Sequence, residues 1–207
     1  MRPRIRQVLF DFDEVLARYH HEKRIAHLAA FAGCGHERVR EVLFTSGLET
    51  EYDGGAIGTA AYLGRLGDGI GRTVDEEAWI ASRLAGSIAD AAMLARVAAL
   101  DESLALGVLT NNGALMARAI ARIVAPVFHR LDGRVLCSGA LRMRKPEPVI
   151  FVHALERLGW DAATTLFVDD SFANVQAARR AGLHAETVKD ARSFGRVLKR
   201  YAMGRAG

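Results

Sequence analysis

The stretch VLFDFDEVL, Val8 to Leu16, decides the fold and poses a problem in electrostatics. Its first residues are apolar and suit a strand buried in a core, but Asp11 and Asp13 follow at once. Two nearby carboxylates repel each other, and burying either one costs free energy unless a positive charge compensates. We therefore expect a cation beside the end of this strand.

The composition is that of one medium-sized domain, or of a core with a small insert: the chain has 207 residues and a formal net charge of +4. Its basic residues are scattered, and no basic stripe alternates with aromatic residues, so we expect no nucleic-acid partner. No apolar run is long enough to cross a bilayer, so we expect no membrane partner either. Cys34 and Cys137 form no paired motif, which favours free thiols and a cytoplasmic location.

Short apolar runs, each followed by polar or turn residues, recur along the chain. They are QVLF (7–10), LALGVLT (104–110), RVLC (134–137) and TTLFV (164–168), with AETV (185–188) as a further candidate. Such runs are typical of parallel strands buried on both faces. Helical periodicity covers 113–128, where Pro126 is expected to stop the helix, as well as 146–159 and 172–182. The alternation predicts an α/β fold with a parallel sheet.

Residues 17–89 have a different pattern. Apolar residues recur at helical spacing, as at Ile25, Leu28 and Ala29, and glycine-rich breaks separate the helical stretches. We see no apolar strand in this part of the chain. The sequence therefore predicts a helical insert after the first strand of the sheet.

Polar side chains follow the predicted strands, at the edge where an open parallel sheet binds its ligands. These are Asp11 and Asp13 after the first strand, Thr110 to Gly113 after the second, Lys145 beyond the third, and Asp169, Asp170, Ser171 and Asn174 after the fourth. Carboxylates in this number favour Mg²⁺. A hydroxyl, a lysine and backbone N–H groups suit a phosphate. A carboxylate can then attack phosphorus.

At these residues the chain resembles the haloacid dehalogenase (HAD) superfamily of phosphohydrolases. DFDEVL resembles the first motif of the family, LTNNG the second, KPEPVIF the third and FVDDSFANVQAARRAG the fourth. The resemblance implies a Rossmann-like, doubly wound α/β core formed by 1–16 and 90–207. It also implies that 17–89 form a helical cap of the C1 type, as in subfamily IA.

The resemblance also implies a role for each residue. Asp11 is the nucleophile, and Asp13 is the general acid and base, which would have to hold a proton near neutral pH. Thr110 and the Asn111 backbone hold the phosphoryl oxygens, and Lys145 steadies nucleophile and phosphate. The metal ligands implied are Asp11, the Asp13 carbonyl and Asp170, with Asp169 and Asn174 in support.

One residue departs from the family pattern. The position after the second aspartate is usually glycine, and here it is Glu14. Glycine is permissive where a chain bends sharply, so Glu14 raises a question about this turn and adds negative charge near the site. Because some branches of the family carry glutamate there, we interpret it as tolerated.

The predicted function is Mg²⁺-dependent hydrolysis of a small phosphate ester, such as a sugar phosphate, through an aspartyl phosphate, by a monomer or homodimer. A phosphomutase of the β-phosphoglucomutase type would use the same residues. A 2-haloacid dehalogenase is disfavoured because that branch lacks the second aspartate, Asp13. A non-catalytic binding module is disfavoured because binding alone needs no nucleophile and acid together.

Overall fold

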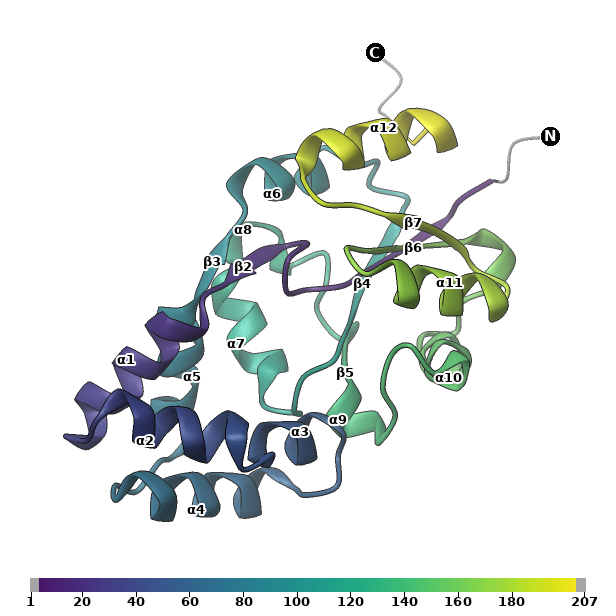
Figure 1. Cartoon of the computed structure of the whole chain (residues 1–207). Coiled ribbons are helices and arrows are strands. Elements are labelled where there is room, and N and C mark those ends of the chain that lie inside the picture. Colours follow the sequence, from purple (N-terminus) through teal and green to yellow (C-terminus); the bar gives the residue numbers. More distant parts are fainter. Residues whose placement is uncertain (1–3, 204–207) are drawn as a thin grey trace.

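A computed structural model describes residues 4–203 and contains a five-stranded parallel sheet (Figure 1). The strand order is β5 (Val135–Cys137), β4 (Ala105–Thr110), β1 (Gln7–Phe10), β6 (Thr165–Asp169) and β7 (His184–Thr187). All five predicted strands are thus confirmed, with boundaries that differ from the prediction by at most one residue. Val8, Leu9 and Phe10 are fully buried, because helices cover both faces of the central strand.

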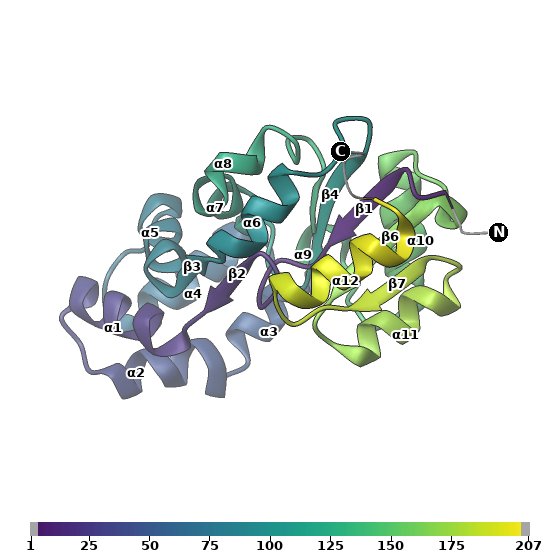
Figure 2. The same ribbon diagram turned by 90° about the horizontal axis from the view of Figure 1, so that it is seen from above.

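Successive residues of the strands point to opposite faces of the sheet, and each face has its own helices. Val8 and Phe10 belong to a cluster that includes α6 (Ala91–Ala98), α7 (Met116–Ile123) and α12 (Ala191–Tyr201). Leu9 belongs to a second cluster with α10 (Pro148–Leu158) and α11 (Phe172–Arg180). The view from above shows the sheet between these two groups of helices (Figure 2). The doubly wound α/β architecture is therefore confirmed.

The insert after β1 lies beside the core and is mainly helical (Figure 1). Its elements are α1 (His21–Ala32), α2 (His36–Arg40), a π-helical turn (Glu41–Thr45), α3 (Leu48–Asp53), α4 (Thr59–Ile70) and α5 (Glu76–Gly86). The expectation of no strand here was wrong. β2 (Ala17–Tyr19) and β3 (Ser87–Ala89) form an antiparallel pair at the two ends of the insert. These strands are three residues long and pair across the whole insert, so they leave no apolar run in the sequence.

The predicted helix over 113–128 is interrupted. α7 ends at Ile123, and Pro126 lies in the first turn of a separate short helix, α8 (Ala125–Phe128), instead of stopping the first one. Proline is favoured in the first turn of a helix because no intrahelical hydrogen bond is lost there. The remaining elements are α9 (Ser138–Leu141) and a 3₁₀ turn (Ala162–Thr164).

The insert meets the core a second time at the C-terminal end of α3. The Asp53 carboxylate accepts a hydrogen bond from Gly113 N at 2.7 Å, and its carbonyl accepts one from the Ser138 hydroxyl. Gly113 is required here, because a Cβ atom at this position would lie 2.0 Å from the Tyr52 ring. The contact places α3 directly beside the end of β4.

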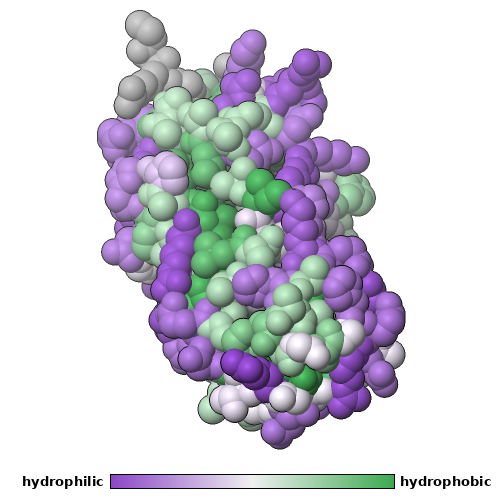
Figure 3. All heavy atoms as spheres, turned by 90° about the vertical axis from the view of Figure 1, so that its left-hand side faces the viewer, coloured by the Kyte–Doolittle hydropathy of each residue, from purple (hydrophilic) through white to green (hydrophobic). Residues whose placement is uncertain are grey.

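The surface seen from the side of the insert carries an apolar strip between hydrophilic margins (Figure 3). Ile88 of β3, with 46% of its surface exposed, is one of the exposed large hydrophobic residues. Within residues 4–203, no helix combines the length and the apolar character needed to cross a membrane.

Candidate active site

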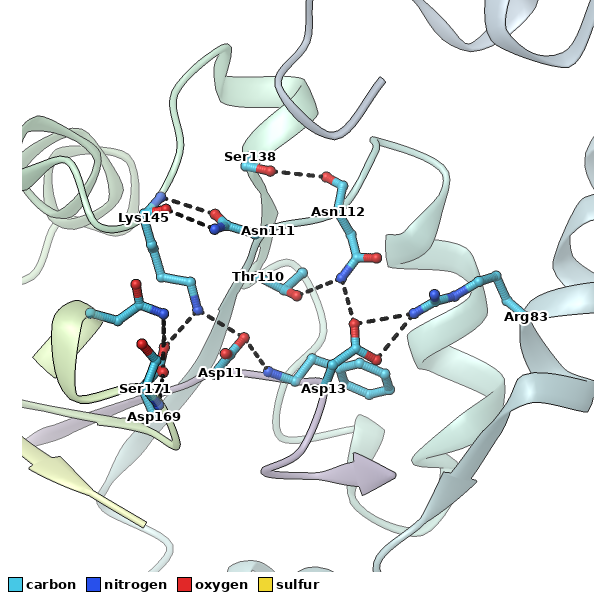
Figure 4. Close-up of polar contacts among 12 residues, drawn as sticks. Asp11, Asp13, Arg83, Thr110, Asn111, Asn112, Ser138, Lys145, Asp169 and Ser171 are labelled. Carbon is cyan, nitrogen blue, oxygen red and sulfur yellow. Dashed lines mark hydrogen bonds and ion pairs between the residues drawn. The ribbon is translucent and has the colours of Figure 1, made fainter. Parts of the chain in front are cut away.

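The ends of three neighbouring strands bring the central residues of the site together. β1 pairs with β4 on one side and with β6 on the other, so Asp11, Thr110 and Asp169 leave the sheet at the same edge. Asp11 N donates to the Val168 carbonyl at 2.8 Å, which extends the strand pairing to the first acid. All three side chains point into one region above the sheet edge (Figure 4).

Lys145 supplies one of the positive charges that the sequence requires. Its Nζ lies 2.8 Å from Asp11 Oδ1 and 2.8 Å from Asp169 Oδ2, and only 4% of the residue is exposed. Burial by itself lowers the pKa of Lys145, but the charges of Asp11 and Asp169 outweigh it, and the net pKa is raised. Lys145 is therefore a fixed cation between two carboxylates.

Asp11 has two oxygens in different surroundings. Oδ1 accepts hydrogen bonds from Phe12 N at 2.7 Å and from Lys145, whereas no group within residues 4–203 donates to Oδ2. Burial raises the pKa of Asp11 to about 8; Lys145 lowers this pKa and Asp169 raises it further. The site therefore has more negative charge than Lys145 alone balances, and a further cation would hold Asp11 ionised.

A divalent cation fits the acidic group beside Lys145. Asp11, Asp169 and Asp170 each offer an oxygen, and these atoms lie within 4.8 Å of one another. Asp169 already accepts hydrogen bonds from Ser171 N and Asn174 Nδ2, as well as from Lys145. No other residue in 4–203 donates to the Asp170 carboxylate, so Asp11 and Asp170 keep the free oxygens. A set of hard carboxylate oxygens suits Mg²⁺.

Asp13 turns away from this group toward the insert (Figure 4). Arg83 Nη2, from α5, lies 3.1 and 3.2 Å from the two carboxylate oxygens of Asp13, and Asn112 Nδ2 donates to Asp13 Oδ2 at 2.9 Å. Arg83 is 2% exposed, while about a quarter of the Asp13 side chain is exposed. The two aspartates of the opening motif therefore have separate cations, Lys145 for Asp11 and Arg83 for Asp13.

The residues after β4 hold these groups in place. The Thr110 hydroxyl accepts a hydrogen bond from Asn112 Nδ2 at 2.7 Å. The Asn111 side chain pairs with the backbone of Lys145, donating to its carbonyl at 2.8 Å and accepting from its N–H at 2.9 Å. Every candidate residue predicted from the sequence lies at this sheet edge. The Asn174 amide donates to both carboxylate oxygens of Asp169.

Two residues of the site were missed in the sequence, Asn112 and Arg83. Asn112 was noted only as one of the polar residues after a strand. Arg83 had a signal that would have found it: it lies four residues after Trp79 and three after Ile80, on the buried face of α5. A basic residue on such a face needs an anionic partner.

Glu14 adopts the left-handed conformation that the usual glycine would favour, with a φ of 63°. Its carboxylate accepts hydrogen bonds from Arg18 Nη1 and Tyr19 N, both at 3.1 Å. These local bonds to β2 offset part of the strain of that backbone conformation. Glu14 is therefore accommodated without displacing Asp13.

A pocket of about 250 Å³ opens between Asp13 and the insert. The core contributes Asn111 and Asn112 to its lining, and Arg83 reaches it from α5. The other lining residues belong to the insert: Tyr19, His21, Phe44, Glu49, Thr50 and Asp53. A molecule bound in this pocket beside Asp13 would therefore contact insert side chains as well.

Comparison with known proteins gives a family match over most of the chain. The family model for haloacid dehalogenase-like hydrolases matches residues 5–182. A HAD family enzyme of Bacteroides thetaiotaomicron, solved in complex with magnesium and inorganic phosphate, has a TM-score of 0.72 and 22% identity. That match covers 88% of this chain and 93% of the other, and at this identity it shows a common fold.

Two curated relatives match shorter stretches. A sesquiterpene phosphatase of Aspergillus oryzae is 36% identical over 74 residues, 31% of this chain and 37% of the relative. A phosphatase of Mycobacterium tuberculosis is 38% identical over 86 residues, 41% of this chain and 39% of the relative. The matched segments thus span well under half the length of these curated relatives.

Proposed function

This chain belongs to the haloacid dehalogenase-like hydrolases, and we propose that it hydrolyses phosphate monoesters through a phosphoryl group carried on Asp11. The observation that carries the proposal is the contrast between the two acids of one short loop. Asp11 has a carboxylate oxygen without a hydrogen bond beside Lys145, and Asp13 is held separately by Arg83 and Asn112. One acid is thus placed to attack and the other to transfer protons.

The comparisons support the choice of phosphate as the transferred group. Both curated relatives are named phosphatases, and a structural neighbour was solved with magnesium and inorganic phosphate. A 2-haloacid dehalogenase remains disfavoured, because it would have no use for the proton-transferring carboxylate at Asp13.

The first step forms a bond between Asp11 and phosphorus while the ester P–O bond breaks. A protonated Asp13 gives its proton to the leaving oxygen, so the alcohol leaves neutral. Lys145, fixed by two carboxylates and by the Asn111 side chain, reduces the repulsion between the attacking Asp11 carboxylate and the phosphoryl oxygens.

The second step hydrolyses the acyl phosphate. Asp13, now a carboxylate, takes a proton from water as the water oxygen bonds to phosphorus, and the bond from phosphorus to Asp11 breaks. Arg83 and Asn112 hold the Asp13 carboxyl group in position for this transfer. The Thr110 hydroxyl and the Asn111 backbone are proposed to hold the phosphoryl oxygens.

Mg²⁺ would be held by Asp11, Asp170 and the Asp13 carbonyl, with Asp169 and Asn174 in support. The Asp13 carbonyl is suited to this, because no backbone N–H within residues 4–203 donates to it. When bound, the ion supplies positive charge against the phosphoryl oxygens and the ionised Asp11.

We further propose that 17–89 form a cap over a core of 1–16 and 90–207. Insert residues supply most of the lining of the pocket beside Asp13, so a cap there would restrict the size of the leaving group and the access of water to the acyl phosphate.

The test is phosphate release from p-nitrophenyl phosphate and a panel of sugar phosphates, with and without Mg²⁺. The wild type should need Mg²⁺, and Asp11→Asn should be inactive. Asp13→Asn should retain Mg²⁺ binding and lose turnover of alkyl esters, whose leaving group needs a proton. Transfer of the phosphoryl group back to a sugar, without phosphate release, would support the phosphomutase alternative instead.

A further inference from the structure

The pocket beside Asp13 is where the alcohol part of an ester would lie, because Asp13 must reach the leaving oxygen. The core contributes Asp13, Asn111 and Asn112 to its lining, and the insert contributes the other lining residues. Its volume of about 250 Å³ is slightly below the range usual for drug-sized ligands, which favours a small leaving group.

The acidic groups of the pocket outnumber its cations. Asp13, Glu49 and Asp53 line it, and Arg83 is the one lysine or arginine among the lining residues in 4–203. Arg83 contacts both oxygens of Asp13 and stacks 4.1 Å from the centre of the Tyr19 ring. An anionic group on the substrate could gain Arg83 only in competition with Asp13.

A second arginine, Arg24, does not line the pocket but contacts the lining residue Glu49. Arg24 is fully buried and donates to Glu49, Tyr19 and Tyr62. Burial would raise the pKa of Glu49, but the charge and hydrogen bond of Arg24 outweigh it and lower the pKa, so Glu49 is ionised. The charge of Arg24 is balanced by Glu49 and does not attract a ligand.

His21 adds no positive charge. Burial and the charges of Arg24 and Arg83 lower its pKa, although Asp13 and Glu49 oppose them, so the ring is neutral at physiological pH. It stands between Tyr19 and Phe44, with ring centres 4.3 and 5.0 Å away. These three rings give the pocket one side that suits carbon-bound hydrogens.

Asp53, also in the lining of the pocket, offers a free hydrogen-bond acceptor. Its Oδ1 accepts from Gly113 N, and no group within residues 4–203 donates to Oδ2. Burial, and then the charge of Glu49, raise its pKa to about 7, so it is mostly ionised at pH 8. Glu49 and Asp53 are then both carboxylates in the lining, while Arg83 is engaged by Asp13 and Arg24 by Glu49.

We infer that this pocket selects a small leaving group rich in hydrogen-bond donors, a neutral polyol or an amino alcohol, and rejects a leaving group with a second anion. The inference rests on the proposed phosphate-ester hydrolysis. Hydroxyl or ammonium groups would donate to Glu49 and Asp53, and the carbon chain would lie against the aromatic side. A carboxylate or second phosphate would face the Glu49 and Asp53 carboxylates, while Arg83 is engaged by Asp13.

The test compares glycerol 3-phosphate with 3-phosphoglycerate, which carries a carboxylate in place of a hydroxymethyl group, and with O-phosphoethanolamine. At pH 8 with Mg²⁺, kcat/KM should favour glycerol 3-phosphate over 3-phosphoglycerate by about tenfold or more, the effect of about 1.4 kcal/mol. Phosphoethanolamine should rank with the glycerol ester. Equal turnover of the anionic ester, or a preference for it, would overturn the inference.

A pair of variants on the insert assigns the effect to the pocket. Asp53→Asn keeps an acceptor for Gly113 N but removes the charge. It should reduce the ratio of kcat/KM for glycerol 3-phosphate over 3-phosphoglycerate at least threefold, mainly by raising kcat/KM for 3-phosphoglycerate. Asp68→Asn, an exposed carboxylate on α4, should leave it unchanged. If both variants discriminate like the wild type, the charge of the pocket is not the cause and the inference is wrong.

Binding separates this inference from the proposed reaction. The Mg²⁺-loaded Asp11→Asn protein should bind glycerol 3-phosphate about tenfold more tightly than 3-phosphoglycerate, as measured by calorimetry. If no ester is hydrolysed but this binding ratio is found, the proposed reaction fails and the pocket inference stands. If neither ester binds, or both bind alike, the pocket inference fails.

Discussion

Replacing Lys145 by methionine removes the ammonium and keeps an unbranched side chain in the same place. The ammonium lies 2.8 Å from oxygens of both Asp11 and Asp169, and Asp169 is fully buried. Removing one partner of a buried ion pair typically costs about 3–5 kcal/mol. Asp169 keeps its hydrogen bonds from Ser171 and Asn174, so we expect the lower end of that range, about 3 kcal/mol at pH 8 without divalent cations.

The loss of unfolding free energy in Lys145→Met should grow as the pH rises from 5 to 8. Burial raises the pKa of Asp11 to about 8, so between pH 4 and 8 the folded chain binds this proton more tightly than the unfolded chain does. A raised carboxyl pKa contributes stability that is present at low pH and lost as the pH rises through 8. In the variant a proton is the only neutralising group left beside Asp11. The difference from wild type should therefore be smaller at pH 5 than at pH 8.

The assay is urea unfolding followed by circular dichroism, in EDTA, at both pH values. Lys199→Met, an exposed position on α12, is the control and should change the unfolding free energy by less than about 0.5 kcal/mol. With Mg²⁺ and p-nitrophenyl phosphate, Lys145→Met should also lose at least about 100-fold in kcat/KM. A variant as stable as the control at pH 8 would refute the claim that Lys145 balances the buried acids.

Three further outcomes are expected. Glu14→Gly relieves the strain of the left-handed backbone but loses the hydrogen bonds to Arg18 and Tyr19, so its unfolding free energy should stay within about 1 kcal/mol of wild type. Glu14→Val should lose about 2 kcal/mol of unfolding free energy. Equal stabilities of the two variants would contradict the assigned backbone strain. Arg83→Met should lose about 2 kcal/mol of unfolding free energy, less than the loss for a fully buried ion pair, because Asp13 is partly exposed. It should also lower kcat more than it changes the Mg²⁺ concentration for half activity. An unchanged kcat would show that Arg83 does not position Asp13. Because the pKa of Asp53 is raised in the folded chain, its proton stabilises the fold below pH 4, and this stability is lost as the pH rises toward 7. The unfolding free energy of Asp53→Asn should therefore fall less steeply between pH 4 and 7 than that of the wild type, by up to ~1.4 kcal/mol per pH unit. Parallel curves of unfolding free energy against pH for variant and wild type would rule this out.

The sequence predicted the sheet edge well, because the signals there are local. Each strand is an apolar run that ends at a polar residue, and parallel strands must end at the same edge, so Asp11, Thr110 and Asp169 could be brought together before any coordinates. The short strands β2 and β3 were missed because pairing between the two ends of an insert leaves no local pattern.

The pairs that side chains form within the site were harder to predict than the residues that belong to the site. Arg83 is 70 residues from Asp13 in the chain, and only the packing of α5 against the core brings them together. Asn111 was expected to offer its backbone to a phosphate, and nothing in LTNNG indicates that its side chain instead pairs with the backbone of Lys145. Side-chain pairing across distant segments depends on tertiary geometry, which one sequence does not specify.

The covalent role of Asp11 is the central claim, and trapping the phosphorylated protein tests it most directly. The Asp13→Asn protein, mixed with Mg²⁺ and p-nitrophenyl phosphate, whose leaving group needs no proton, should accumulate an acyl phosphate. Borohydride reduction and peptide mass spectrometry should then find reduced aspartate at Asp11, and none in an Asp11→Asn control. Release of phosphate by the wild type with no reducible aspartate in either protein would mean that water attacks the ester directly, and would contradict the account.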